Sequence, residues 1–350
     1  MSQAITAIQH PRETLDSVRQ KIFFIVGCGR SGTSLLQSML LSHGGITIPP
    51  ETQFYGVCAA RGSRFGDLSQ DDNFKRASDW AWQLYQRRGI NIDKAIYDSL
   101  AEDAPRSWSG IFLMMLTAYG IEQGTDRVGD KSIVHTAFVG EMMEGFPEAR
   151  FIHIVRDPRA VALSGIKAGF CTNFIGASIS SWRTSADVNA KFAQTLGPSR
   201  YLMLRYEELV TDPEPALRQL CEFLGIEMTP EMMEHHLRKD QGWLDREKSW
   251  MENTLKPVFT SSIDKWRNEL STGKVAMVEH ALGDSMQTFG YELVGARTSL
   301  PGARVWLSRY LGKMDNLRIR LTRFVRIQGL AILTGNKAGV SKADSKPQTG

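Results

Sequence analysis

Short, nearly continuous apolar runs alternate with longer segments of helical periodicity along most of the chain. Runs of this kind are typical of strands that are buried on both faces of a parallel sheet. The alternation predicts an α/β fold, in which a parallel central sheet is flanked by helices and ligands bind at the carboxyl ends of the strands. The predicted strands are Lys21–Val26, Ile46–Ile48, Arg127–Gly129, Arg150–Val155 and Tyr201–Leu204.

Glycines mark the ends of the helical segments between these strands. Thr33–Ser42 stops before Gly44, Arg159–Ala168 stops at Gly169, and Pro213–Leu224 stops at Gly225. A glycine after the last periodic residue is a common helix stop. Asp212, directly before Pro213, is expected to be the N-cap of that helix. Residues 65–123 have a wholly helical pattern, and we expect a helical insertion there that covers the acceptor site.

The chain divides into four predicted parts. Residues 1–20 form an N-terminal extension and residues 21–295 the main domain. Residues 296–334 are expected to form a basic amphipathic helix, and residues 335–350 a disordered tail.

Two alternatives remain open for the basic helix. From residue 301 onward the chain carries ten Lys or Arg against two Asp, a net charge of +8. Apolar residues recur along it at spacings of three and four, so the helix has one apolar face. It either packs on its own chain or on a second copy in a homodimer, or residues 304–334 lie on an anionic membrane surface. The stripe consists of Leu307, Tyr310, Met314, Leu317, Leu321 and Phe324.

Composition indicates a globular protein with a large core. The chain has 350 residues, of which 42% are hydrophobic. Its first 300 residues have a net charge of −4, which argues against a nucleic-acid surface. The N-terminus lacks the apolar core of a signal peptide, so a cytoplasmic location is expected. The apolar segment Ile111–Ile121 is too short to span a bilayer and predicts a buried helix.

Cysteine spacing predicts no metal site. The four cysteines are scattered, with no pair at the spacing of metal ligands, which fits a reducing compartment and no structural zinc. They are Cys28, Cys58, Cys171 and Cys221.

A glycine-bearing loop, Gly27-Cys28-Gly29-Arg30-Ser31-Gly32-Thr33-Ser34, joins the first predicted strand to the first predicted helix. Unpaired backbone N–H groups and the positive end of the helix dipole converge there, so the loop predicts an anion site. The glycines have the Walker spacing, but Thr33-Ser34 replaces the Lys-Ser/Thr that contacts a triphosphate and its magnesium ion. With its cation inside the loop at Arg30, the loop fits a 5′-phosphate better than a triphosphate.

Further motifs follow the other strands. Together with the loop they resemble the sulfotransferases that use 3′-phosphoadenosine 5′-phosphosulfate (PAPS), above all the tyrosylprotein sulfotransferases and their bacterial relatives. The resemblance extends from about residue 21 to residue 291. These motifs are Glu51-Thr52, Gly129-Asp130-Lys131-Ser132, Arg156-Asp157-Pro158-Arg159 with Ser164, Arg205-Tyr206-Glu207-Glu208-Leu209, Lys256-Pro257-Val258 and Lys265-Trp266.

The resemblance implies a PAPS site without a metal ion. It implies that Arg30 and the backbone of residues 31–34 hold the 5′-phosphosulfate, with Arg30 stabilising the charge that develops as the S–O bond breaks. Arg156 and Ser164 would hold the 3′-phosphate from two sides. The further contacts that the resemblance assigns to PAPS are Ser31, Gly32, Thr33, Ser34, Tyr206, Lys256 and Lys265.

The same resemblance implies the groups that perform the reaction. The acceptor is a hydroxyl on a small molecule, carbohydrate, lipid or peptide, and it needs a base. Glu51 stands in the position of the catalytic glutamate, and Lys131 in that of the lysine that contacts the sulfuryl group in direct in-line transfer. His135 is the alternative base. His153, within an apolar strand, is expected to be a core histidine.

Two other classes of function remain open from the residues alone. A P-loop kinase would need a magnesium site, and no predicted apolar strand ends in an aspartate directed at the loop. A catalytically inactive anion-binding protein could have the same fold. The joint presence of Arg30, Glu51 and Lys131 favours the enzyme.

Overall fold

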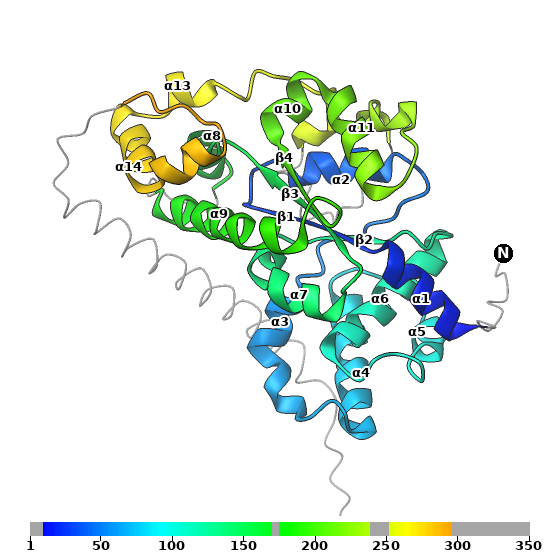
Figure 1. The fold of residues 1–350 in the computed structure, drawn as a ribbon. Coiled ribbons are helices and arrows are strands. Elements are labelled where there is room, and N and C mark those ends of the chain that lie inside the picture. The colour runs from blue at the N-terminus through cyan, green and yellow to red at the C-terminus, as the bar shows by residue number, and fades with distance from the viewer. Residues whose placement is uncertain (1–9, 170–174, 239–251, 296–350) are drawn as a thin grey trace, which may run out of the picture.

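A parallel sheet of four strands runs through the middle of the molecule (Figure 1). The computed structural model describes residues 10–169, 175–238 and 252–295. The strand order is β2-β1-β3-β4, so the first strand of the chain is central. The α/β fold with a parallel sheet is therefore confirmed. The strands are β1 (Phe23–Gly27), β2 (Gly129–Lys131), β3 (Arg150–Val155) and β4 (Tyr201–Arg205).

The predicted strand Ile46–Ile48 is reduced to a single parallel bridge between Thr47 and Val128. The Thr47 N–H donates to the Arg127 carbonyl over 3.1 Å, and the Gly129 N–H donates to the Thr47 carbonyl over 2.9 Å. Pro49 and Pro50 follow, and neither has an N–H with which to continue a ladder. The predicted strand over 127–129 lies two residues early, because β2 includes polar residues that an apolar pattern leaves out.

Helices cover both faces of the sheet because the side chains of β1 alternate between two apolar clusters. Phe24 and Val26 pack on one face into the cluster that contains α6 (Trp108–Gln123). Phe23 and Ile25 pack on the other face, with residues of α2 (Thr33–Leu41) and α11 (Pro213–Leu224). The remaining α-helices of the described residues are α1 (Pro11–Lys21), α3 (Phe54–Arg61), α4 (Asp71–Arg87), α5 (Lys94–Ser99), α7 (Val139–Gly145), α8 (Pro158–Lys167), α9 (Gly176–Leu196), α10 (Tyr206–Thr211), α13 (Lys265–Glu269) and α14 (Thr272–Thr288).

The helices predicted around Thr33–Ser42, Arg159–Ala168 and Pro213–Leu224 are α2, α8 and α11. Asp212 occupies the N-cap position of α11 as predicted, but its side chain makes no hydrogen bond to the helix. Pro213 at the first helical position fixes a helical φ and has no N–H to satisfy.

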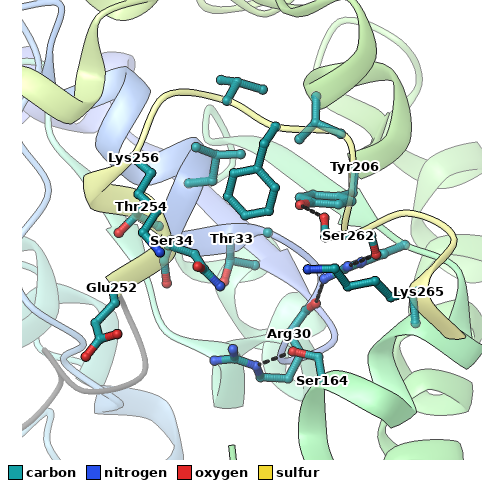
Figure 2. Close-up of a pocket in the computed structure, with 18 of the residues that line it drawn as sticks. Arg30, Thr33, Ser34, Ser164, Tyr206, Glu252, Thr254, Lys256, Ser262 and Lys265 are labelled. Atoms are coloured by element: carbon teal, nitrogen blue, oxygen red, sulfur yellow. Dashed lines mark hydrogen bonds between the residues drawn. The ribbon is translucent and has the colours of Figure 1, made fainter. Parts of the chain in front are cut away.

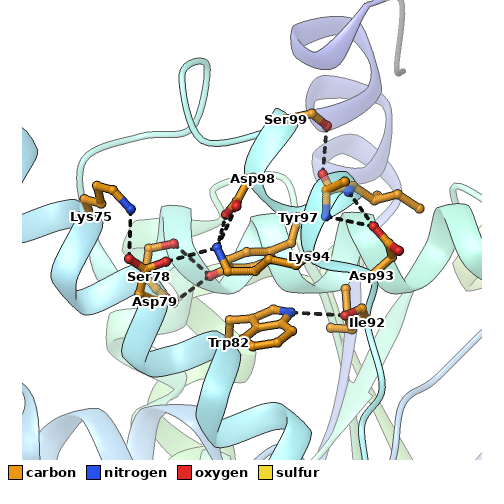
Figure 3. Close-up of polar contacts among 12 residues, drawn as sticks. Lys75, Ser78, Asp79, Trp82, Ile92, Asp93, Lys94, Tyr97, Asp98 and Ser99 are labelled. Atoms are coloured by element: carbon orange, nitrogen blue, oxygen red, sulfur yellow. Dashed lines mark hydrogen bonds and ion pairs between the residues drawn. The ribbon is translucent and has the colours of Figure 1, made fainter. Parts of the chain in front are cut away.

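The 65–123 segment consists of α4, α5 and α6 with short connections. Its apolar part, Ile111–Ile121, lies within α6, which is buried through most of its length as expected. The junction of α4 and α5 is polar: Lys94 pairs with Asp79 and Asp98, while Ser78 bonds to Tyr97 beneath them (Figure 3). A contact of this segment with the acceptor stays a prediction.

The N-terminal helix α1, which overlaps the predicted extension, packs against α6 and buries Leu15 and Val18. None of the helices within the described residues is both long and apolar enough to cross a membrane. The predicted basic helix 296–334, the tail 335–350 and Cys171 lie outside the described residues.

Candidate active site

The loop between β1 and α2 has the backbone of an anion cradle. Gly32 has a φ of +98°, and a Cβ there would lie 2.4 Å from the Tyr206 ring. Arg30 is one of two described non-glycine residues with positive φ, at 71°. The Leu36 N–H bonds to the Gly32 carbonyl over 3.0 Å as the first turn of α2 closes. The earlier N–H groups of this turn therefore face out of the helix N-terminus.

A cavity of about 480 Å³ opens beside this loop (Figure 2). It lies at the carboxyl ends of β1, β3 and β4, where a parallel sheet binds its ligands. Its volume is that of a site for a nucleotide-sized ligand. The predicted residues that line it are Arg30, Gly32, Thr33, Ser34, Arg156, Ser164, Tyr206, Lys256 and Lys265.

Four predicted site residues do not line this cavity. Ser31 is fully buried in the loop, and its hydroxyl has no hydrogen-bond partner within the described part of the chain. Glu51 and Lys131 lie together at the end of β2, and His135 is buried behind them. The structure therefore separates a nucleotide-sized cavity from the carboxylate, lysine and histidine predicted for the reaction.

Arg30, rather than Arg156, contacts Ser164. The Arg30 Nε donates to Ser164 Oγ over 3.1 Å, and Arg156 Nη1 donates to the Arg30 carbonyl over 3.1 Å. Arg156 and Ser164, which are predicted to hold the 3′-phosphate from two sides, thus both bond to Arg30, which lies between them. Two guanidinium groups and one hydroxyl meet at one wall of the cavity.

This wall concentrates positive charge. Burial lowers the pKa of Arg30 from its usual value, and the charge of Arg156 lowers it further. Lys256 and Lys265 add two ammonium groups to the same cavity. Because like charges held close together repel, an anion bound among them would stabilise the whole group.

The segment that carries the predicted residues Lys256 and Lys265 closes over the loop. Residues 252–265 arch across the cavity, with Lys256 on one side and Lys265 on the other (Figure 2). Arg156 Nη2 donates to the Ser262 carbonyl over 2.9 Å, and the hydroxyls of Tyr206 and Ser262 are 2.8 Å apart. Ser262 stands in a run of polar residues, and nothing in its spacing distinguishes it.

Arg156 is held from several directions. Its guanidinium lies 4.2 Å above the Tyr206 ring, a cation–π contact, and its carbonyl accepts the Trp182 indole N–H over 2.8 Å. Directly behind it, Arg159 forms buried ion pairs with Asp157 at 2.7 Å and Glu279 at 2.6 Å. The turn after β3 is therefore fixed by α9 and α14 before any ligand binds.

Glu51 and Lys131 form a close pair at the end of β2. Lys131 Nζ donates to Glu51 Oε1 over 2.6 Å. The lysine side chain is 1% exposed and that of Glu51 is 17% exposed. A lysine this deeply buried requires a partner for its charge, and Glu51 is that partner.

His135 belongs to the interior. Its Nδ1 lies 2.8 Å from Asp130 Oδ2, and its Nε2 accepts the Tyr55 N–H over 3.2 Å. His153 is a core histidine, as expected: it bonds to Tyr201 and Ser185, and burial lowers its pKa to about 3. Cys28, Cys58 and Cys221 are buried free thiols. Within the described residues no group of three or more His, Cys, Asp or Glu side chains could hold a metal ion.

Comparison with known proteins gives a consistent result. The model of the sulfotransferase family matches residues 23–230. The chain is 24% identical over 279 residues to protein-tyrosine sulfotransferase A of Caenorhabditis elegans, covering 77% of this chain and 67% of that protein. It is 25% identical over 289 residues to protein-tyrosine sulfotransferase 2 of Gallus gallus, covering 79% and 68%.

A solved sulfotransferase structure has a similar fold. The sulfotransferase domain of the Synechococcus PCC 7002 olefin synthase superposes with a TM-score of 0.56 at 24% identity, over 78% of this chain and 95% of that domain. This likeness concerns the fold. The family model, in contrast, covers more than half of the sequence, from β1 past the end of α11. On that match the chain belongs to the sulfotransferase family, whose sulfuryl donor is PAPS.

Proposed function

We propose that this protein moves the sulfuryl group from PAPS to a hydroxyl acceptor by direct in-line transfer, with Glu51 as the general base. One observation carries the proposal. A cavity of about 480 Å³ gathers Arg30, Arg156, Lys256 and Lys265 at the positive end of α2. A nucleotide with phosphates at both ends of its ribose suits such a cavity, because each anionic group would meet a cation.

The residues fit the parts of PAPS separately. The backbone of the loop and Arg30 would hold the 5′-phosphosulfate, whose sulfuryl group is the one transferred. Arg156 would hold the 3′-phosphate on the side of the cavity where it bonds to the Arg30 carbonyl, and Ser164 would add a hydroxyl. Leu35, Val258 and Phe259 give the cavity an apolar portion suited to a base ring.

Glu51 is supported as the base over His135 by its surroundings. A base must reach the acceptor hydroxyl, and the Glu51 side chain keeps 17% of its surface exposed. His135 is 1% exposed, and both ring nitrogens face protein groups: Asp130 on one side and the Tyr55 N–H on the other. His135 therefore has no nitrogen left for a substrate.

In the proposed step one bond to sulfur forms as another breaks. The acceptor oxygen bonds to sulfur while the bond between sulfur and the bridging phosphate oxygen breaks. Glu51 takes the hydroxyl proton, Arg30 stabilises the charge on the leaving phosphate, and Lys131 stabilises the transferring group. The products are the sulfated acceptor and adenosine 3′,5′-bisphosphate (PAP).

Calorimetry in the presence of a chelator tests the binding part. PAP should bind more tightly than adenosine 5′-phosphate, because Arg156 and Ser164 contribute only when a 3′-phosphate is present. Binding of adenosine 5′-phosphate as tight as that of PAP, or a requirement for magnesium, would contradict the proposal.

An acceptor panel with labelled PAPS, read by mass spectrometry, tests the transfer. The panel holds one member of each class: a tyrosine-containing peptide, N-acetylglucosamine, 4-nitrophenol and a long-chain alcohol. ATP with magnesium serves as the control donor and should yield no transfer. A panel in which ATP is the only donor used would favour a kinase instead.

A further inference from the structure

A second side-chain pair lies directly behind Glu51 and Lys131. Thr52 Oγ1 donates to Asp130 Oδ1 over 2.7 Å. Thr52 is fully buried and Asp130 is 1% exposed. Thr52 follows Glu51 in the chain, and Asp130 precedes Lys131. The two segments are thus joined twice, by an inner pair (Thr52 and Asp130) and an outer pair (Glu51 and Lys131).

Side chains hold the 51–53 segment where the backbone cannot. Thr47 is bonded on both sides to the backbone of 127–129, but Pro49 and Pro50 have no N–H with which to extend that pairing. Beyond the prolines, the inner pair and the Ser132 Oγ, which accepts the Gln53 N–H over 3.0 Å, hold the segment against β2. The position of Glu51 therefore depends on the side chains of Thr52, Asp130 and Ser132, which are chain neighbours of Glu51 and Lys131.

Asp130 joins both ends of the turn that follows Glu51. Its Oδ1 accepts from Thr52, and its Oδ2 lies 2.8 Å from His135 Nδ1, whose other nitrogen accepts the Tyr55 N–H. Between them Gln53 has a φ of 52°, a left-handed conformation that costs energy in a residue other than glycine. A conformation of this kind persists only where its surroundings fix it, and here the buried network around Asp130 fixes it.

We propose that Thr52 and Asp130 are positioning residues, which hold the Glu51 carboxylate against Lys131 from behind. Neither touches the reacting groups. The inference rests on the proposed role of Glu51, and it adds that the Thr52 hydroxyl is required for that role. A serine can supply the hydroxyl, whereas valine keeps the shape and cannot.

Thr52→Val and Thr52→Ser test this, each in the natural chain and in a Glu51→Gln background. With the panel acceptor that turns over fastest, Thr52→Val should lower kcat about tenfold or more, because small misplacements of a reacting group are costly. PAP affinity should stay within about twofold, since the cavity does not include Thr52. Thr52→Ser should restore most of kcat. In the Glu51→Gln background, Thr52→Val should cost nothing more, because the group it positions is gone.

A measurement without an acceptor keeps the test independent of turnover. Lys131 should resist acylation by acetic anhydride in the natural chain, where it is buried and paired, and peptide mass spectrometry should find it acylated several-fold faster in Thr52→Val. If Thr52→Val does not fold, Thr52→Ala, which adds no bulk, is measured in the same way.

Ser185→Ala is the matched control. It removes another buried hydroxyl, whose Oγ lies 2.7 Å from His153 Nε2 in the core and does not line the cavity. It should change neither kcat nor Lys131 acylation. Equal losses from Thr52→Val in both backgrounds, or unchanged acylation of Lys131, would overturn the inference. Full activity of Glu51→Gln alone would instead refute Glu51 as the base, while the acylation result would still decide whether the inner pair holds Lys131.

Discussion

Two lysine–carboxylate pairs in this protein have the same length in opposite surroundings. Lys131 Nζ lies 2.6 Å from Glu51 Oε1, and Lys94 Nζ lies 2.6 Å from Asp98 Oδ2. The side chains of the first pair are 1% and 17% exposed, and those of the second are 36% and 54% exposed. Distance alone therefore does not separate a pair at the proposed reaction site from a pair on the outside of a helix.

Burial separates them. An exposed pair contributes about 0–1 kcal/mol to stability because water screens it. Removing a lysine from water costs several kcal/mol, which one carboxylate only partly repays. A fold with no use for the Lys131 charge would be at least as stable with an apolar side chain there. The burial of the first pair is therefore what the proposed catalytic role predicts, whereas the second pair is an ordinary exposed contact within α5.

Glu51→Gln should have the largest effect. The amide keeps the shape but cannot take a proton, so kcat should fall on the order of 10²-fold or more while PAP affinity stays nearly unchanged. Steady-state kinetics and calorimetry measure the two quantities. Glu122→Gln, a change of the same type in α6 at a carboxylate that bonds to the Asp93 N–H, is the control and should leave kcat unaltered.

One result would reverse this assignment. If Glu51→Gln keeps most of its activity while a folded His135→Ala variant loses it, the base is His135. The buried pairing of His135 with Asp130 would then have to open during the reaction.

Arg156→Ala should have the next largest effect, on a buried cation whose partners are carbonyl groups rather than a carboxylate. PAP affinity should fall roughly 10–100-fold, the value of one or two charge-assisted hydrogen bonds. Adenosine 5′-phosphate should lose much less. Calorimetry with both nucleotides measures the difference, and Arg218→Ala on the exposed side of α11 is the control. An equal loss for the two nucleotides would place Arg156 elsewhere than at the 3′-phosphate.

His153 extends the comparison to a buried group with no anionic partner. Burial lowers its pKa to about 3, against 6.5 unfolded, so the unfolded chain binds the extra proton between these values. Stability is therefore complete above about pH 6.5 and falls with acidification, by about 2 kcal/mol at pH 5. Urea unfolding between pH 7 and pH 5 measures this slope. His153→Gln should flatten the dependence of stability on pH, although the variant is less stable at pH 7. An unchanged slope would mean that another group takes up the proton. His235 is such a group, because burial lowers its pKa to about 4.

Lys94→Met should have the smallest effect. The pair with Asp98 is exposed, so the free energy of unfolding should change by about 1 kcal/mol or less. Activity should stay the same. A loss of several kcal/mol on urea unfolding would mean that the junction of α4 and α5 is more rigid than its exposure indicates.

Much of the fold and of the cavity could be predicted because their signals are local. An apolar run followed by a glycine loop specified β1 and the start of α2. The resemblance assigns Arg156 and Tyr206 to PAPS, and each stands just after a strand, at the edge where a parallel sheet gathers ligand groups, so both line the cavity. The register of β2 was missed by two residues, since its pairing with β1 rather than its own polarity extends the strand over Asp130 and Lys131.

What could not be predicted depends on residues far apart in the chain. Thr52 and Asp130 are 78 positions apart, and each looks like an ordinary polar residue next to a more conspicuous one. The contact of Arg30 with Ser164, 134 positions along the chain, is another pairing that no local pattern indicates. Ser262 reaches the site only because the 252–265 segment crosses over the loop.

The two prolines beside β2 have a consequence for self-association. An edge strand with free N–H and C=O groups can recruit a strand from another molecule, the first step of many aggregation reactions. Beside β2, the segment that runs from Thr47 through Pro49 and Pro50 lies at this edge of the sheet, and the two prolines have no N–H to donate. At the opposite edge, β4 exposes 38% of Met203. Strand addition, if the protein is partly unfolded, should therefore start at β4, and a charged residue at Met203 is the substitution that would suppress it.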